Sequence, residues 1–221
     1  MGKRKRKRSL TAEDFAMRGF EFGKKQFGED AIRRAFFEIL RQGPESQSSV
    51  LRPNIPYIVC IFESRLSIVL TSDGLPPIPE NSAPDKFEYP VLINAEQRLE
   101  DLVAVQNIKS NIDLSKVEDV VAAPKIGFYW VWMQGGEVYK DRCTSEIEKI
   151  FGKRERGGTL RERLFFHLYY PDALFRCFPE CAGSRVMCDV PYFVVWDDQI
   201  KIYSGKENVG VRGYGPTTCS I

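Results

Sequence analysis

The hydrophobic and polar positions of the chain change from a helical to a strand-like spacing near residue 50. Before that point, Phe15, Phe22 and the apolar residues of 32–40 recur at the three- and four-residue intervals of a helix face. Residues 45–49 are polar and rich in Ser and Gln, which is typical of a linker. This part of the sequence therefore predicts a pair of N-terminal helices followed by a connection.

The next hundred residues predict a mixture of strands, a loop and a helix. Residues 57–62 and 66–70 are short β-branched runs that predict a hairpin, with Cys60 in its core. The proline-rich stretch 76–90 predicts a surface loop, because proline lacks the N–H that a strand ladder needs. Residues 99–106 carry one apolar helical face, and the aromatic run 126–133 predicts a strand.

Capping signals and a second hairpin dominate the last third of the chain. Ser145 with Glu148, and Thr159 with Glu162, match the capping box that begins a helix. Residues 191–196 and 200–203 predict a β-hairpin. The glycine-rich segment 205–215 predicts a tail that loops over the sheet.

These elements predict an α+β fold, with a mainly antiparallel sheet packed against several short helices and an N-terminal helical pair. The predicted organisation is a disordered basic arm at residues 1–9, a helical region at 10–43 and an α+β domain at 50–221.

Composition adds an exclusion and an asymmetry of charge. With 43% hydrophobic and 28% charged residues among 221, the chain is typical of a globular protein and not of a disordered or fibrous one. Its longest apolar run is too short to span a bilayer, and its basic start lacks the apolar segment of a secretory signal. We therefore expect a cytoplasmic protein with reduced cysteines and no membrane partner.

All of the excess positive charge lies in one short arm. The formal net charge is +2, but without the arm 26 basic residues face 30 acidic ones, so the remainder of the chain is mildly acidic. Adjacent cations neutralise phosphates and give salt-sensitive nucleic-acid binding, whereas the alternative is a solvated tail that binds nothing specific. The residues of this candidate nucleic-acid contact are Lys3, Arg4, Lys5, Arg6, Lys7 and Arg8.

Three cysteines and the single histidine form the candidate metal site. Cys177 and Cys181 have the close spacing of one zinc-ligand pair, whereas Cys188 and His167 stand apart in the sequence. A cluster of reduced thiols is the alternative to a zinc site. A cysteine nucleophile activated by His167 needs the two groups within hydrogen-bond reach, which spacing alone does not establish.

Two further segments contain basic residues with a possible ligand role. Arg185, in the turn of residues 183–185, is a candidate to bind a carboxylate or phosphate, and a structural ion pair is its alternative. Residues 152–159 approach the phosphate-binding loop pattern, but Gly158 stands where that loop has its lysine. We therefore interpret this segment as a basic connection between helices, and no cofactor is expected.

The order of features from about residue 53 onward, most clearly over residues 125–195, resembles an uncharacterised bacterial family of unknown function. The resemblance implies a bacterial cytoplasmic setting and supplies no activity and no catalytic residue. It rests on the segments 127–132, 135–136, 159–162, 170–174, 183–185 and 190–192.

The sequence thus favours a non-enzymatic binding or interaction module whose basic arm contacts nucleic acid, with any protein partner unknown. The alternative hypothesis is an enzyme of unknown class with a site near His167 and the loop 177–185.

Overall fold

The computed structural model describes residues 53–71, 74–81, 83–171, 177–197 and 199–220. The chain divides into two units, Met1–Gly43 and Pro44–Ile221, and every described residue belongs to the second. The predicted basic arm and N-terminal helical pair lie outside the described residues.

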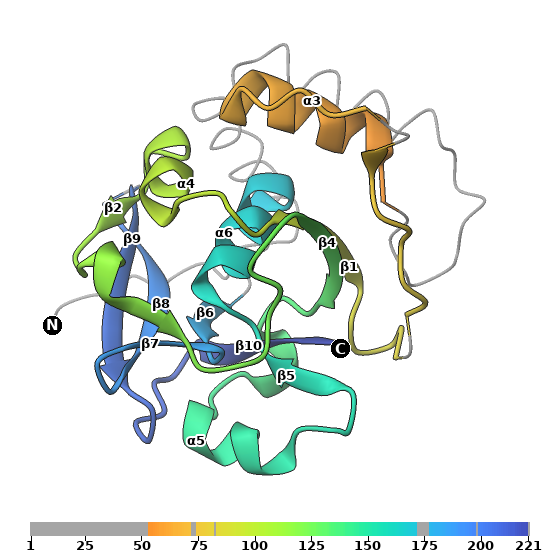
Figure 1. Ribbon diagram of the computed structural model, residues 1–221. Helices are drawn as coiled ribbons and strands as arrows, with labels where there is room; N and C mark the ends of the chain where they lie inside the picture. Colours follow the sequence, from red (N-terminus) through yellow and green to blue (C-terminus); the bar gives the residue numbers. More distant parts are fainter. Residues whose placement is uncertain (1–52, 72–73, 82, 172–176, 198, 221) are drawn as a thin grey trace, which may run out of the picture. The chain divides into compact units, whose positions relative to one another are not determined.

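The described part is built on a curled, mainly antiparallel sheet with short helices, which confirms the α+β prediction (Figure 1). Two strand pairs are parallel, β10 with β6 and β2 with β9, and β5 pairs with β10 beside the main path. The main strand order is β1 (Tyr89–Asn94), β4 (Phe128–Met133), β10 (Tyr214–Ser220), β6 (Phe178–Cys181), β8 (Asp189–Trp196), β7 (Ser184–Val186) and β3 (Val117–Asp119), with β2 (Lys109–Ser110), β5 (Glu155–Gly157) and β9 (Gln199–Lys206) off it.

Helix α6 (Leu160–Tyr169) is the central element of the core. In Figure 1 it lies between β1 and β4 on one side and β8 and β9 on the other. It contacts β1 directly, and nine of its ten residues are buried. A helix that is buried on all sides belongs to the centre of a core. The other helices of the described residues are α3 (Ile55–Leu66), α4 (Leu99–Val105) and α5 (Thr144–Ile147), with single 3₁₀ turns at Leu114–Lys116, Glu137–Tyr139 and Glu148–Ile150.

The first predicted hairpin is wrong, because residues 55–66 form helix α3. Asn54 caps the helix by accepting a hydrogen bond from the Tyr57 N–H at 3.1 Å, and a proline occupies the first turn, where its missing N–H costs nothing. Ile58, Ile61 and Phe62 then share a buried helical face. Packing of that face outweighs the strand preference of the β-branched residues, and Cys60 is exposed instead of lying in a strand core.

The proline-rich segment is a loop, as predicted, over most of its length, and β1 begins at its end. Two tryptophans of β4 hold it in place. The indole N–H of Trp130 donates to the Pro76 carbonyl at 3.0 Å, and that of Trp132 donates to the Pro79 carbonyl at 2.8 Å. The aromatic strand therefore anchors the loop as well as filling the core.

Of the two predicted capping boxes, only the second forms. Thr159 accepts from the Glu162 N–H, and the Glu162 carboxylate accepts from the Thr159 N–H, so α6 begins as predicted. The first helix begins one residue before Ser145, because Cys143 is its N-cap. Ser145 lies inside the first turn, where its N–H donates to the Glu207 carbonyl.

The C-terminal segments bring one confirmed and two corrected predictions. The hairpin of β8 and β9 is confirmed, with Trp196 opposite Gln199. The end of the glycine-rich tail is not a loop but strand β10, between β4 and β6. Gly215 permits this, because a Cβ there would lie 2.2 Å from the Gly136 carbonyl oxygen. Residues 155–157 are strand β5 rather than a connection between helices.

Among the described residues, no helix has the length and apolar character needed to cross a bilayer.

Candidate functional site

The outer face of the sheet carries a group of aromatic rings at the junction of β6, β8, β9 and β10. Strand register places Tyr192 opposite Tyr203 and Phe178 opposite Tyr214. The Tyr192 and Tyr203 rings stack at 6.1 Å, and Tyr214 meets Tyr192 edge-on at 5.3 Å. We call this group, together with Trp196, the aromatic face: Phe178, Tyr192, Trp196, Tyr203 and Tyr214.

The aromatic face lines a shallow groove of about 290 Å³, with Val194 and Val195 as its aliphatic residues. Trp196 is 61% exposed, and the other four aromatic residues are half-buried. Tyrosine and tryptophan combine an apolar ring with a polar group and commonly lie partly exposed, and here such rings share one groove.

Strand alternation explains how the sequence builds this face. Phe193, Ile200 and Ile202 point to the opposite side of β8 and β9, where each is at most 1% exposed. Since side chains alternate between the two faces of a strand, burying these residues forces Tyr192 and Tyr203 outward.

Two charged side chains of the described strands, Lys201 and Glu180, lie beside the aromatic face. Lys201 Nζ lies 5.5 Å from the centroid of the Trp196 ring, a cation–π distance. Glu180 lies opposite Tyr192 in the sheet and accepts a hydrogen bond from the Thr144 hydroxyl at 2.8 Å. Burial raises the pKa of Glu180, and burial likewise raises the pKa of Tyr192 and Tyr214, which keeps both phenols neutral.

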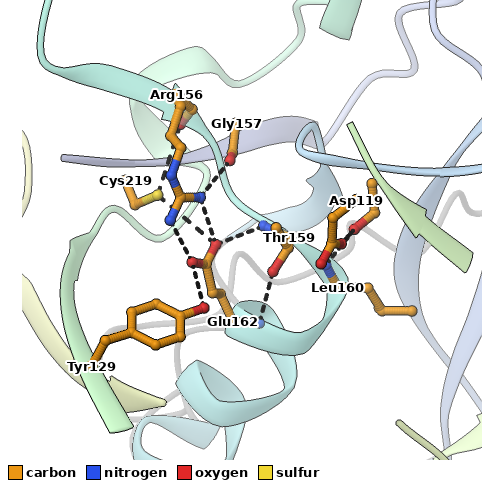
Figure 2. Close-up of polar contacts among 9 residues, drawn as sticks. Asp119, Tyr129, Arg156, Gly157, Thr159, Leu160, Glu162 and Cys219 are labelled. Atoms are coloured by element: carbon orange, nitrogen blue, oxygen red, sulfur yellow. Dashed lines mark hydrogen bonds and ion pairs between the residues drawn. The ribbon is translucent and has the colours of Figure 1, made fainter. Parts of the chain in front are cut away.

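A buried polar network joins β4, β5, α6 and β10 (Figure 2). The Arg156 guanidinium donates to both oxygens of Glu162, at 2.6 and 2.9 Å, and the Tyr129 hydroxyl donates to the same carboxylate at 3.0 Å. The Thr159 N–H is a further donor. Hydrogen bonds from Arg156 hold the pKa of Glu162 below its usual range despite complete burial.

This network has no free group for chemistry. Glu162 is 0% exposed and is surrounded by donors, so its carboxylate is neither accessible nor basic enough to take a proton from a substrate. Beside it, Ser184 donates to Asp119 at 2.7 Å and accepts from the Leu160 N–H, which ties β7 and β3 to the start of α6. We interpret the role of the network as structural, because its hydrogen bonds hold α6 to the strands around it.

The candidate metal residues do not gather around one point. His167 is fully buried on α6, and its Nδ1 pairs with the Gln106 side chain at 2.7 Å. Cys177 and Cys181 are buried, whereas Cys188 is exposed. Within the described ranges, no three His, Cys, Asp or Glu side chains form a group able to hold a metal ion.

The same geometry bears on nucleophilic chemistry. Burial lowers the pKa of His167 to about 3 and raises that of Cys177 to about 11. An inaccessible, non-basic imidazole and a protonated thiol are poorly suited to general base and nucleophile roles.

Arg185, a candidate ligand contact, forms structural ion pairs instead. Its guanidinium pairs with Glu148 at 2.6 Å and Glu207 at 3.0 Å, and it also donates to the Ala182 and Ser184 carbonyls. With these partners, the side chain holds β7 to the neighbouring loops. The basic arm, the other candidate contact, lies outside the described residues.

Sequence reasoning identified the hairpin of the aromatic face but not the face itself. The signal was present, because pairing the predicted strands through their turn places Tyr192 opposite Tyr203. Phe178 and Tyr214 had no such signal, since β6 and β10 pair across 36 residues of chain.

Comparison with known proteins adds no relative: no family model, no curated protein and no solved structure matches the chain.

Proposed function

We propose that this protein is a non-enzymatic module that binds single-stranded nucleic acid through the aromatic face, assisted by its basic arm. The observation that carries the proposal is the set of accessible rings around a groove on the sheet. Every nucleobase has a π-face, so aromatic side chains on a platform bind unpaired bases with little dependence on sequence.

The distribution of charge supports a model in which the basic arm attracts phosphates and the aromatic face stacks with bases. The chain without its arm is mildly acidic, so the arm supplies most of the attraction to phosphates. Lys201 beside Trp196 adds one cation at the groove. The aromatic rings then supply contacts that salt does not screen.

The test is the affinity of the full-length protein for a fluorescently labelled single-stranded oligothymidylate, measured by anisotropy at several salt concentrations. Tyr203→Leu keeps an apolar side chain but removes a stacking ring. Because one base–aromatic stack is worth about 1–3 kcal/mol, we expect affinity to fall roughly 5- to 150-fold, with the salt dependence unchanged.

Deleting residues 3–8 should have the complementary effect. If all six cations contact phosphate, the slope of log affinity against log salt falls by about 4 in magnitude.

The matched control for Tyr203→Leu is Tyr57→Leu, which removes a half-buried tyrosine from α3. Equal affinity of Tyr203→Leu and the control would contradict a role of the aromatic face.

A further inference from the structure

A second cleft, of about 440 Å³, lies at the start of strand β5. Ala83 supplies accessible apolar surface, whereas Phe87, which also lines the cleft, is only 2% exposed. Lys86 and the turn of residues 152–155 supply the polar groups. This turn is the segment whose sequence approaches the phosphate-binding loop pattern. The structure therefore places this turn at the edge of an open cleft that shares no lining residue with the aromatic face.

One side of the cleft is held rigid by a hydrogen-bonded ion pair. Lys86 Nζ donates to Glu155 at 2.6 Å and to the Tyr139 hydroxyl at 2.5 Å. Glu155 also accepts from the Thr218 hydroxyl at 2.7 Å and from the Gly152 N–H at 3.2 Å. These bonds hold the pKa of Glu155 below its usual value despite its burial. The bonds that Lys86 donates to Glu155 and Tyr139 hold the pKa of Lys86 above its usual value.

Two cations at the cleft are not neutralised. Lys153 and Arg154 are exposed at the centre of the turn that the Glu155 N–H closes on the Gly152 carbonyl. No other described residue forms an ion pair or hydrogen bond with either of them. Lys86 and Glu155 cancel each other, so the cleft carries about two uncompensated positive charges next to apolar surface.

We infer that this cleft binds a phosphate monoester, with its dianion at Lys153 and Arg154 and its organic part against Ala83 and the methylene groups of Lys86. The charges match, since a monoester carries nearly two negative charges at neutral pH. Arginine suits the oxygens of phosphate because its planar guanidinium donates two parallel hydrogen bonds. The turn offers in addition the N–H groups of Lys153 and Arg154, which lie in its central positions.

This site does not depend on the proposed function. A mononucleotide and the 5′-phosphorylated end of a nucleic acid share the required chemistry, and the experiment distinguishes them. Adenosine monophosphate is titrated into the full chain by calorimetry, and 5′-phosphorylated and 5′-hydroxyl oligothymidylates are compared by anisotropy.

Lys153→Gln with Arg154→Gln is the test variant, and Lys109→Gln with Lys125→Gln removes the same charge from exposed positions outside the cleft. We expect the test variant alone to weaken adenosine monophosphate binding at least tenfold. Tyr203→Leu should leave this binding unchanged, which separates the site from the aromatic face.

A preference for the phosphorylated oligonucleotide that disappears only in the test variant identifies a nucleic-acid end as the ligand. Binding of adenosine monophosphate without that preference identifies a free mononucleotide. Equal weakening in both double variants, or binding of neither probe by the wild-type protein, would overturn the inference.

Discussion

Two buried arginines in the same region of the sequence have opposite surroundings. Arg156 shares two hydrogen bonds with Glu162, whereas none of the three side-chain nitrogens of Arg163 has a partner among the described residues. Arg163 stacks 4.1 Å from the centroid of the Phe166 ring, and burial lowers its pKa to about 10. An unpaired buried charge is costly. The unpaired guanidinium of Arg163 therefore lowers the stability of the core around α6. No local pattern in the sequence indicates that this side chain is buried.

The burial of His167 makes the stability of the protein depend on pH. Its pKa falls to about 3 in the folded chain from an ordinary value of 6.5, mainly because of burial. Below pH 6.5 the unfolded chain therefore binds a proton that the folded chain does not. As a result, the free energy of unfolding decreases as the pH is lowered. We expect the free energy of unfolding to fall by about 2 kcal/mol between pH 7 and pH 5 through this group.

The measurement is urea unfolding at both pH values for the wild type and His167→Gln. His167 is the single histidine of the chain. The carboxyl groups with shifted pKa values, such as Glu180 and Glu162, are present in both proteins, so the difference between the two proteins isolates His167. An identical pH dependence in both would show that folding leaves the pKa of His167 unchanged, which contradicts the expectation.

At the scale of elements, local sequence signals predict a helix or strand correctly where the stabilising contacts are local. They fail where tertiary packing or pairing with distant strands determines the secondary structure. The capping box of Thr159 and Glu162 predicts α6 correctly, because both of its hydrogen bonds are local. The β-branched residues of α3 favour a strand locally, but the Asn54 cap and a buried face at helical spacing produce a helix. The strand character of β10 depends on pairing with distant strands, which no local pattern reveals.

The end of α3 provides a pair of substitutions with opposite predicted signs. Ser67 terminates the helix in the left-handed region at φ 56°, where glycine is favoured, so Ser67→Gly should stabilise the protein by up to about 1 kcal/mol. Ser64 lies inside the same helix and is exposed, so Ser64→Gly should destabilise it by roughly 0.5 kcal/mol.

Thermal or chemical unfolding of the two variants beside the wild type measures this pair. If residues 57–70 were the hairpin that the sequence pattern suggests, Ser64 would lie in its turn, and Ser64→Gly would not be the more harmful of the two.

For the whole molecule, the fold class was predictable and the candidate site was only partly so. The period of the hydrophobic pattern and the predicted final hairpin were enough to establish an α+β fold with a mainly antiparallel sheet. The aromatic face needs four strands, two of which meet through the parallel pairing of β6 with β10. Such non-local pairing brings Phe178 and Tyr214 to Tyr192, and the sequence contains no short-range signal for it.

The central claim is that unpaired bases stack on the aromatic face, and Trp196 reports on this directly. It is 61% exposed, whereas the other two tryptophans, Trp130 and Trp132, are 7% and 6% exposed. A base stacked on an indole ring quenches its fluorescence. The decisive measurement is tryptophan emission of the full chain during titration with a single-stranded oligothymidylate, in the wild type and in Trp196→Phe. We predict saturable quenching in the wild type and almost none in Trp196→Phe. Quenching of equal size in both proteins, or none in either when anisotropy shows the oligonucleotide bound, would contradict the account.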